Sequence, residues 1–321
     1  MNWSSTILIL WTVLFLGCNE TKKSVQSASK TSEVEVADSP VSKYLIEAED
    51  LLPLLNDDRI KIIDFRKEKE YRKGHIDGAI NIWRAHIEDT SLPFKGMMAK
   101  PDSIASLLGG LGMSNDDILI VYDDRGSCDA ARFWWVMQNL DFEHVKILNG
   151  GLKAWSKVGG TVNKNEVTLE KARFQLPKAP SYRYLIGKSQ LQQEVSAGTP
   201  LLIDTRTHDE YSGKRQKAGA SLGGRIPGSH WIDWTEAIDY HGSLKIKPKV
   251  ELEKIYEKWN IAKDYPIVTY CHTGVRSAHT TFVLTQLLGF KNVKNYDGSW
   301  TEWSYYNDQP MERDSLTTIL K

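Results

Sequence analysis

A cysteine and an arginine separated by four residues form the most reactive pattern in this sequence. Cys271 ends a short, β-rich apolar run, Gly274 follows it, and Arg276 precedes an apolar-periodic segment, residues 278–288, that predicts a helix. The thiol therefore lies in a tight loop between a strand end and a helix start. Such a loop points backbone N–H groups inward, and the helix dipole adds partial positive charge. Both effects favour a thiolate and an anionic substrate, so Cys271 is a candidate nucleophile.

The size and composition of the chain indicate an ordinary globular protein. Its 321 residues are 41% apolar and 26% charged, with a net charge of zero, and this length allows about two domains. A nucleic-acid-binding protein would usually be basic, so we expect no nucleic-acid partner. We also expect neither a metal nor an organic cofactor. The three cysteines, at 18, 128 and 271, show neither metal-ligand spacing nor a disulfide framework.

The N-terminus predicts a signal peptide. Residues 7–16 form an apolar run that is too short to span a bilayer but suits the core of a signal peptide. Gly17 and Cys18 resemble the lipobox of bacterial lipoproteins, which implies a lipid on Cys18, a membrane anchor and a place in the bacterial cell envelope. The first six residues carry no Lys or Arg, which departs from that pattern. An uncleaved anchor and a cytoplasmic protein are the alternatives.

Two stretches of the chain match each other without a gap. Residues 120–155, moved by 148 positions, fall on residues 268–303 with ten identities. We infer two copies of one domain. Two shorter matches keep the same order, 62–71 with 202–211 and 74–79 with 224–229.

Each copy is expected to alternate strands and helices. This order predicts the α/β class, with a parallel sheet flanked by helices on both faces and ligands at the carboxyl ends of its strands. In the first copy we expect strands at 60–64, 79–81, 117–122 and 145–148, and helices at 44–55, 67–72, 103–111 and 130–140, with a final helix after Gly150. The expected boundaries are 1–18 for the signal peptide, 19–40 for a disordered tether, 41–162 and 182–316 for the two domains, and 163–181 for the linker.

Residues 41–311 resemble a tandem rhodanese-type sulfurtransferase, of the thiosulfate or 3-mercaptopyruvate type. The resemblance implies two rhodanese-like domains and a sulfur transfer in two steps. Cys271 takes a sulfur from a small-molecule donor as a persulfide, and a thiol or cyanide then removes it. The motifs that carry the resemblance are Asp204-Thr205-Arg206 with Glu210-Tyr211, Arg225-Ile226-Pro227-Gly228-Ser229, the loop from Cys271 to Ser277, and Asp297-Gly298-Ser299-Trp300 with Trp303.

The same resemblance assigns the remaining site residues. The loop amides of residues 272–277 would hold the transferred sulfur as a preorganised anion site does. The substrate-binding candidates are His272, Thr273, Gly274, Val275, Arg276 and Ser277, together with Arg206 and Arg225.

The first copy is expected to be catalytically silent. Asp123 stands where the second copy has Cys271, and an aspartate cannot carry a persulfide. Cys128 aligns with Arg276 rather than with Cys271, so we interpret it as a packing thiol. His75 is interpreted as structural, with a role in the active site as the alternative. We expect a monomer.

The donor stays open between thiosulfate and 3-mercaptopyruvate. Arg276 and a cationic His272 would favour the dianionic thiosulfate, towards which we lean, whereas a Thr273 hydroxyl would suit mercaptopyruvate. The arginine that many family members carry beside the loop falls at Glu210. The candidates for the missing charge are Arg225, Arg215 and Lys217. The alternative role of Arg276 is a structural ion pair with Asp204 or Glu210.

Two other functions compete with the enzyme. A binding module or non-catalytic persulfide carrier could use the same fold, but an intact loop from Cys271 to Arg276 favours catalysis. A phosphatase is disfavoured, because related phosphatases place five residues between the cysteine and the arginine, and this chain places four.

Overall fold

The computed structural model describes residues 42–306 and 308–314, which belong to one compact unit. The segments predicted as a signal peptide and a tether, and the predicted lipidation site at Cys18, lie outside the described residues. No helix in the described part of the chain is long and apolar enough to cross a membrane. The described residues also hold no group of three or more His, Cys, Asp or Glu side chains placed to bind a metal ion.

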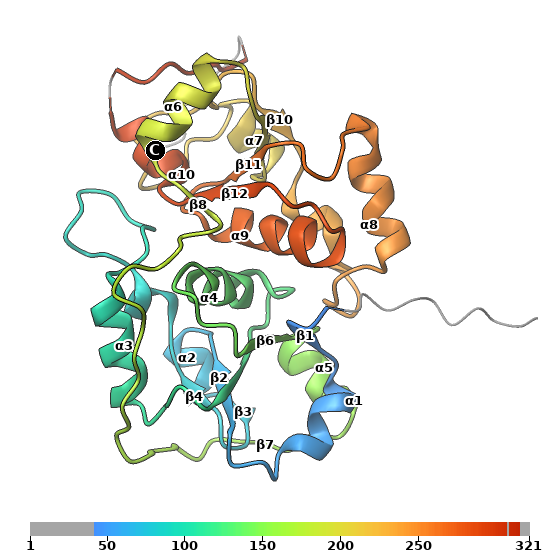
Figure 1. The fold of residues 1–321 in the computed structure, drawn as a ribbon. Coiled ribbons are helices and arrows are strands. Elements are labelled where there is room, and N and C mark those ends of the chain that lie inside the picture. Colours follow the sequence, from blue (N-terminus) through green and yellow to red (C-terminus); the bar gives the residue numbers. More distant parts are fainter. Residues whose placement is uncertain (1–41, 307, 315–321) are drawn as a thin grey trace, which may run out of the picture. The chain divides into compact units, whose positions relative to one another are not determined.

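The first half of the chain builds a five-stranded parallel sheet (Figure 1). Its strands follow the order β1-β6-β5-β2-β4, so the chain starts at one edge, reaches the other edge at β4, and then returns through the central β5 to β6. Parallel strands require crossover segments, which are supplied here by the helices between them. The strands are β1 (Leu45–Ile46), β2 (Ile60–Asp64), β4 (Ile80–Asn81), β5 (Ile118–Tyr122) and β6 (Val145–Leu148).

Helices cover both faces of this sheet. Ile62 and Ile63 of β2 point to opposite sides and join different apolar clusters. On one side, α1 (Ala48–Leu51) and α5 (Gly151–Lys157) bury Leu51 and Trp155. On the other, α3 (Pro101–Gly110) and α4 (Cys128–Asn139) bury Ile104 and Phe133. The short α2 (Glu68–Tyr71) and the antiparallel pair of β3 (His75–Ile76) and β7 (Val162–Asn163) complete this half.

The second half repeats this architecture. Its sheet has the order β10-β9-β11-β12-β8, again with parallel neighbours. One face packs against α6 (Lys188–Ser196) and α10 (Ser299–Tyr305), and the other against α8 (Lys249–Tyr256) and α9 (Val275–Phe282). The strands are β8 (Leu185–Ile186), β9 (Leu201–Asp204), β10 (His230–Trp231), β11 (Ile267–Tyr270) and β12 (Val293–Tyr296), and α7 is His208–Tyr211. The predicted fold class is therefore confirmed.

Two sequence predictions of local structure need correction. The expected helix at 44–55 begins as strand β1, because Leu45 and Ile46 pair with Ile147 and Leu148 at the sheet edge. A two-residue strand is too short to give an alternating pattern in the sequence. The expected helix at 278–288 starts earlier, at Val275, and continues as a π-helical turn over Val283–Leu287.

The two halves share one apolar core along α4 and α9, which lie against each other between the sheets (Figure 1). Trp134 of α4 is fully buried there. Its ring packs edge-on against Phe282 of α9 with 4.9 Å between centroids, and against Tyr44 and Tyr184 at 5.8 and 5.5 Å. The helix after the Cys271 loop is thus packed against the helix after the equivalent Asp123 loop, and residues next to both loops line one cavity.

The segment expected as a linker, residues 163–181, packs on the first half. The amide of Ala172 donates to the Gly109 carbonyl at 2.9 Å, and Phe174 is buried beside Phe142. This contact requires a glycine, because a Cβ on Gly109 would lie 2.7 Å from the Ala172 carbonyl oxygen.

Candidate active site

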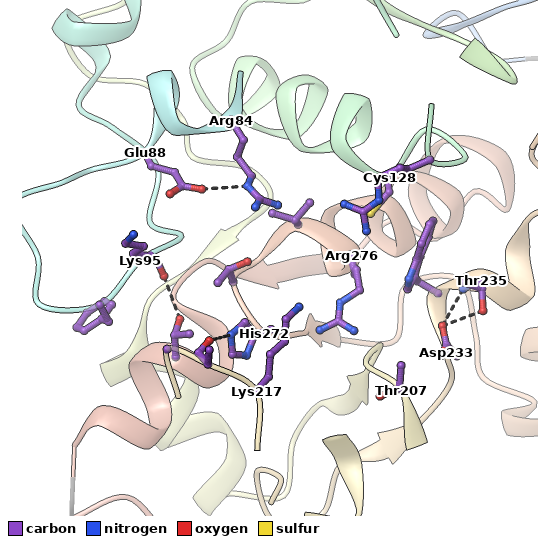
Figure 2. A pocket seen from close by; sticks show the side chains of 18 of the residues that line it. Arg84, Glu88, Lys95, Cys128, Thr207, Lys217, Asp233, Thr235, His272 and Arg276 are labelled. Carbon is purple, nitrogen blue, oxygen red and sulfur yellow. Dashed lines mark hydrogen bonds and ion pairs between the residues drawn. The ribbon is translucent and has the colours of Figure 1, made fainter. Parts of the chain in front are cut away.

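A cavity of about 800 Å³ lies above the Cys271 loop and is lined by both halves of the chain (Figure 2). The loop contributes His272, Thr273, Val275 and Arg276. The Cys271 side chain is fully buried, so its neighbours in the loop, rather than the thiol, form the cavity surface. The first half contributes Arg84, Glu88, Phe94, Lys95, Arg125 and Cys128, and the second half adds Lys217 and Asp233 among others.

Cys271 follows directly after β11, at the carboxyl end of the sheet. Its amide donates to the Ser299 hydroxyl at 3.1 Å, and its carbonyl accepts from the amide of Trp300 at 3.0 Å. The Asp297-Gly298-Ser299-Trp300 motif therefore fixes the backbone on which the thiol stands. Gly274 adopts a φ of 72°, in the left-handed region, and starts α9.

The environment lowers the pKa of the Cys271 thiol. Burial opposes ionisation and is the largest single influence, but the Arg276 charge, the Ser277 hydroxyl and the amides of Ser277 and Thr273 together outweigh it. A thiolate is the nucleophilic form of cysteine, so the loop prepares Cys271 for attack on an electrophile.

Arg276 is held by Glu210 in a two-pronged ion pair. Its two terminal nitrogens donate to the carboxylate oxygens at 2.7 and 2.9 Å. Glu210 itself closes the first turn of α7, where its carboxylate accepts from the Thr207 hydroxyl at 2.9 Å. Of the two structural partners considered for Arg276, the structure thus selects Glu210. The glutamate neutralises part of the Arg276 charge that an anionic substrate would otherwise meet.

The matching loop of the first half shows what such a loop binds. The Asp123 carboxylate accepts four backbone N–H groups, from Arg125 and Ser127 at 2.9 Å each, Asp129 at 2.7 Å and Ala130 at 2.9 Å. Burial, and then the neighbouring Asp129, raise the pKa of Asp123 to about 6, against the effect of these amides. The silent loop is therefore filled by its own anion.

This carboxylate indicates where a persulfide would lie at Cys271. In Asp123 the oxygens are one bond beyond Cγ, just as the outer sulfur of a persulfide is one bond beyond Sγ. Moving the four amide donors by 148 positions places the equivalent amides of the Cys271 loop at Thr273, Val275, Ser277 and Ala278. Preorganised donors of this kind stabilise a charge without having to reorganise when it forms.

The cavity wall is cationic. Five basic side chains line it against two carboxylates. Three of the five are already paired, since Arg84 contacts Glu88 and Asp129, Arg125 contacts Asp129, and Arg276 contacts Glu210. Lys217 and Lys95 form no ion pair with any of the described residues, and they face the cavity from opposite halves of the chain. They leave a net positive charge for an anionic ligand.

His272 differs from its sequence interpretation. It is buried, and its Nε2 lies 3.0 Å from the Ala218 carbonyl. Burial, helped by the nearby Lys217 charge, lowers its pKa to about 4, so the ring is neutral near pH 7 and Nε2 donates to that carbonyl. The cationic His272 considered as a thiosulfate-binding group is therefore corrected to a neutral ring that anchors the Lys217 loop.

Two further binding candidates lie away from the cavity lining. Arg206 is buried and ion-paired to Asp204 at 2.5 Å, and it donates to the Gly224 carbonyl. Arg225 pairs with Glu312 and Asp314. These pairs give both arginines a structural function, and neither is among the lining residues.

His75 also has structural contacts only among the described residues. Its ring nitrogens lie 2.9 and 3.0 Å from the carbonyls of Tyr71 and Asn165, and the ring stacks on Tyr71 with 3.7 Å between centroids.

Several lining residues could not be found from the sequence. Cys128 is buried, as expected for a packing thiol, but it also borders the cavity, and burial raises its pKa well above the usual value. Arg84, Lys95 and Arg125 lie in the silent half, where nothing in the sequence connects them with Cys271. The 148-residue shift is the signal that could have suggested Arg125, because it places Arg125 opposite Thr273.

Comparisons with known proteins agree with this geometry. A model of the rhodanese-like domain matches residues 47–158 and 188–305. A thiosulfate sulfurtransferase of Corynebacterium glutamicum is 31% identical over 292 residues, which cover 85% of this chain and 91% of that protein. The sulfur carrier protein TtuD of Thermus thermophilus is 32% identical over 259 residues, which cover 78% and 89%. The crystal structure of SseA from Escherichia coli, described as a 3-mercaptopyruvate sulfotransferase, matches with a TM-score of 0.71 and 28% identity over 80% of this chain and 98% of that one.

The buried Glu210–Arg276 pair predicts an acid-dependent loss of stability. Arg276 lowers the pKa of Glu210 below its usual value of 4.5, although burial alone would raise it. The pair therefore stabilises the fold fully above that value and progressively less as the pH falls below it. Glu210→Gln leaves Arg276 buried without its counter-charge and should cost about 3–5 kcal/mol at pH 7.

Urea unfolding of both proteins between pH 7 and pH 3 measures this difference, which should shrink below about pH 4.5. Glu68→Gln serves as the control, because its pair with Arg72 is exposed at the surface and should be worth less than about 1 kcal/mol. A difference for Glu210→Gln that does not change with pH would contradict the prediction.

Proposed function

Because the chain belongs to the rhodanese-like family and carries its domain twice, we propose that it moves a sulfane sulfur from thiosulfate to a thiol or cyanide through a persulfide on Cys271. Sulfurtransferase activity agrees with its similarity to thiosulfate sulfurtransferases over most of its length. The observation that carries the mechanism is the loop itself, in which a thiol with a lowered pKa stands within amides that hold a carboxylate in the silent half.

The first half-reaction loads the cysteine. The Cys271 thiolate attacks the outer sulfur of thiosulfate, the sulfur–sulfur bond of the donor breaks, and sulfite leaves with the bonding electrons. The negative charge moves to the outer sulfur of the new persulfide. In the proposed geometry the amides of Thr273, Val275, Ser277 and Ala278 receive this charge, as the equivalent amides receive the oxygens of Asp123.

The second half-reaction empties the cysteine. An acceptor thiolate or cyanide attacks the outer sulfur, and Cys271 leaves as a thiolate that its environment already stabilises. The same low pKa that makes the thiolate available in the first step makes it a good leaving group in the second. We propose that the chain acts as a monomer, because residues from both of its halves line the cavity.

Thiosulfate is the proposed donor because of the charge on the cavity wall. Lys217 and Lys95 lack ion-pair partners among the described residues and can meet a dianion from two sides. Thr273 lines the same cavity and could assist 3-mercaptopyruvate, the sequence-based alternative. That donor carries a single carboxylate and uses less of the available positive charge.

A sulfur-carrier function is the second candidate. The relative named sulfur carrier protein TtuD has about the same identity as the named sulfurtransferases. A carrier would form the same Cys271 persulfide but would surrender it only to a specific protein. The two functions therefore differ in the second half-reaction alone.

The first test incubates the full chain with thiosulfate and cyanide and follows thiocyanate, with intact mass measured in parallel. Wild-type protein should turn over and should gain one sulfur when cyanide is left out. Cys271→Ser should show neither. Turnover that persists in Cys271→Ser would refute the mechanism, whereas a sulfur adduct without turnover would favour the carrier.

Lys217 should control the use of thiosulfate. Removing one charge next to a bound dianion should lower kcat/KM for thiosulfate about tenfold in Lys217→Met, chiefly through KM. Lys214→Met is the matched control, because Lys214 lies in the same loop, is exposed and does not line the cavity. Equal kinetics of the two variants would remove Lys217 from the proposed donor site.

The proposed location is the bacterial cell envelope, with the chain held by a lipid on Cys18. Its support is the apolar run at 7–16, the Gly17-Cys18 pair and the polar segment that follows, all outside the described residues. Cys18→Ser should move the protein from the membrane fraction to the soluble fraction and remove the lipid mass, whereas Cys271→Ser should stay with the membrane. Membrane recovery of Cys18→Ser would refute the anchor.

A further inference from the structure

Arg132 of the silent half reaches the catalytic loop across the interface between the two sheets. It lies on α4 and is 1% exposed. Its Nη2 is 2.6 Å from a carboxylate oxygen of Asp297 and donates to the Gly96 carbonyl at 2.8 Å. Its Nη1 donates to the Gly274 carbonyl, within the Cys271 loop, at 3.4 Å. One guanidinium thus joins the silent half, the loop and the motif that supports the loop.

The Gly274 carbonyl is held from two sides. Besides Arg132, the side-chain amide of Asn295 donates to it at 3.0 Å. A trans peptide is planar, with its C=O and N–H pointing in opposite directions. Fixing the Gly274 carbonyl therefore fixes the direction of the Val275 N–H. The equivalent N–H in the first half, that of Ser127, donates to Asp123, so the Val275 N–H is one of the four cradle amides.

Each half of the chain donates one backbone amide to the other half, and comparing these two hydrogen bonds shows what Arg132 adds. The Met98 amide donates to Asp297 at 2.9 Å, and the Ile246 amide donates to Asn149 at 2.9 Å. Each of these pairs of equivalent residues is 148 positions apart. Asn149, a neutral residue, accepts the amide in the first half. Asp297 accepts it in the second half, and Arg132 neutralises the charge of that aspartate.

The same comparison shows that the carbonyl contacts belong to the catalytic loop. The residue equivalent to Asn295 is Ile147, and the residue equivalent to Arg132 is Thr280. An apolar side chain at Ile147 cannot donate to a carbonyl. The silent loop needs no such support, because its anion is part of the chain and fixes the amides by itself.

The silent half also closes over the loop at Gly96. This residue has a φ of 108°, and a Cβ there would lie 2.6 Å from the Thr273 Cβ. Next to it, the Lys95 carbonyl accepts from the Thr301 hydroxyl at 3.0 Å. Arg132 also donates to the Gly96 carbonyl, so a single side chain contacts both the Cys271 loop and the segment of the first half that covers it.

We propose that Arg132 is a positioning residue for sulfur transfer, which orients the Gly274–Val275 peptide so that its N–H meets the outer sulfur of the Cys271 persulfide. The role rests on the proposed function of the Cys271 loop. It also gives the silent half a function in the reaction, because the amide cradle of the second half is completed by a side chain of the first.

Arg132→Lys tests the role with the charge retained. A lysine can still neutralise Asp297, but one ammonium group cannot reproduce the planar fork that reaches Asp297, Gly96 and Gly274 together. We expect the rate of persulfide formation to fall about tenfold, because one cradle amide is misdirected rather than lost. The pH profile of Cys271 alkylation by iodoacetamide, read by peptide mass, should shift to higher pH.

Arg66→Lys is the matched control. Arg66 is also a buried arginine of the first half, but it is ion-paired to Asp64 at 2.5 Å and bonded to the Gly74 carbonyl, whereas Arg132 contacts the Cys271 loop. Both lysine variants should lose thermal stability to a similar extent, and only Arg132→Lys should change Cys271 alkylation. If the two variants share an unchanged alkylation profile and unchanged persulfide formation, the role of Arg132 is purely structural and the proposal is wrong.

Asn295→Leu provides a second test should Arg132→Lys fold poorly. It removes the other side-chain donor to the Gly274 carbonyl, which comes from the second half of the chain. Its alkylation profile should shift in the same direction, and an unchanged profile would count against the proposal. Alkylation needs no sulfur donor, so these measurements remain decisive even if the wild-type chain gives no thiocyanate, a result that would refute the proposed function alone.

Discussion

Backbone N–H groups that converge on one point in a protein interior need a negative charge at that point. The chain meets this constraint twice. In the first half the acceptor is part of the chain, because Asp123 offers a carboxylate to four amides. In the second half, under the proposed function, it is transient, because Cys271 supplies a thiolate or a persulfide. The same turn from strand to helix therefore serves as a stable structural element in one copy and as a reactive site in the other, and one side chain decides which.

The remaining architecture follows from keeping the second loop oriented without a permanent anion inside it. Its Gly274 carbonyl is held by Asn295 and Arg132, its arginine by Glu210, and its first residue by Ser299. These supports come from three parts of the second half and from α4 of the first. The shared core around Trp134 keeps the support from Arg132 rigid, because α4 cannot shift against α9 without unpacking the aromatic rings between them.

Sequence reasoning reached the fold, the repeat and the loop, because each leaves a local pattern. The strands are apolar runs, the repeat is a constant shift of 148 positions, and Cys271 to Arg276 is a contiguous motif. It did not reach features made by distant parts of the chain. Nothing local marks Arg132 as a neighbour of Gly274, or Lys95 as a wall of the cavity. His272 was misjudged for the same reason, since its burial and low pKa come from the loop of Lys217 and Ala218.

The Arg132–Asp297 contact makes the second half of the chain depend on the first. Asp297 is a buried aspartate whose counter-charge comes from the other copy of the repeat. Released from its partner, the second half would carry that aspartate without a counter-charge and expose the apolar face of α9. The two copies are therefore similar in fold but not interchangeable, because each buries charge and apolar surface that only the other can cover.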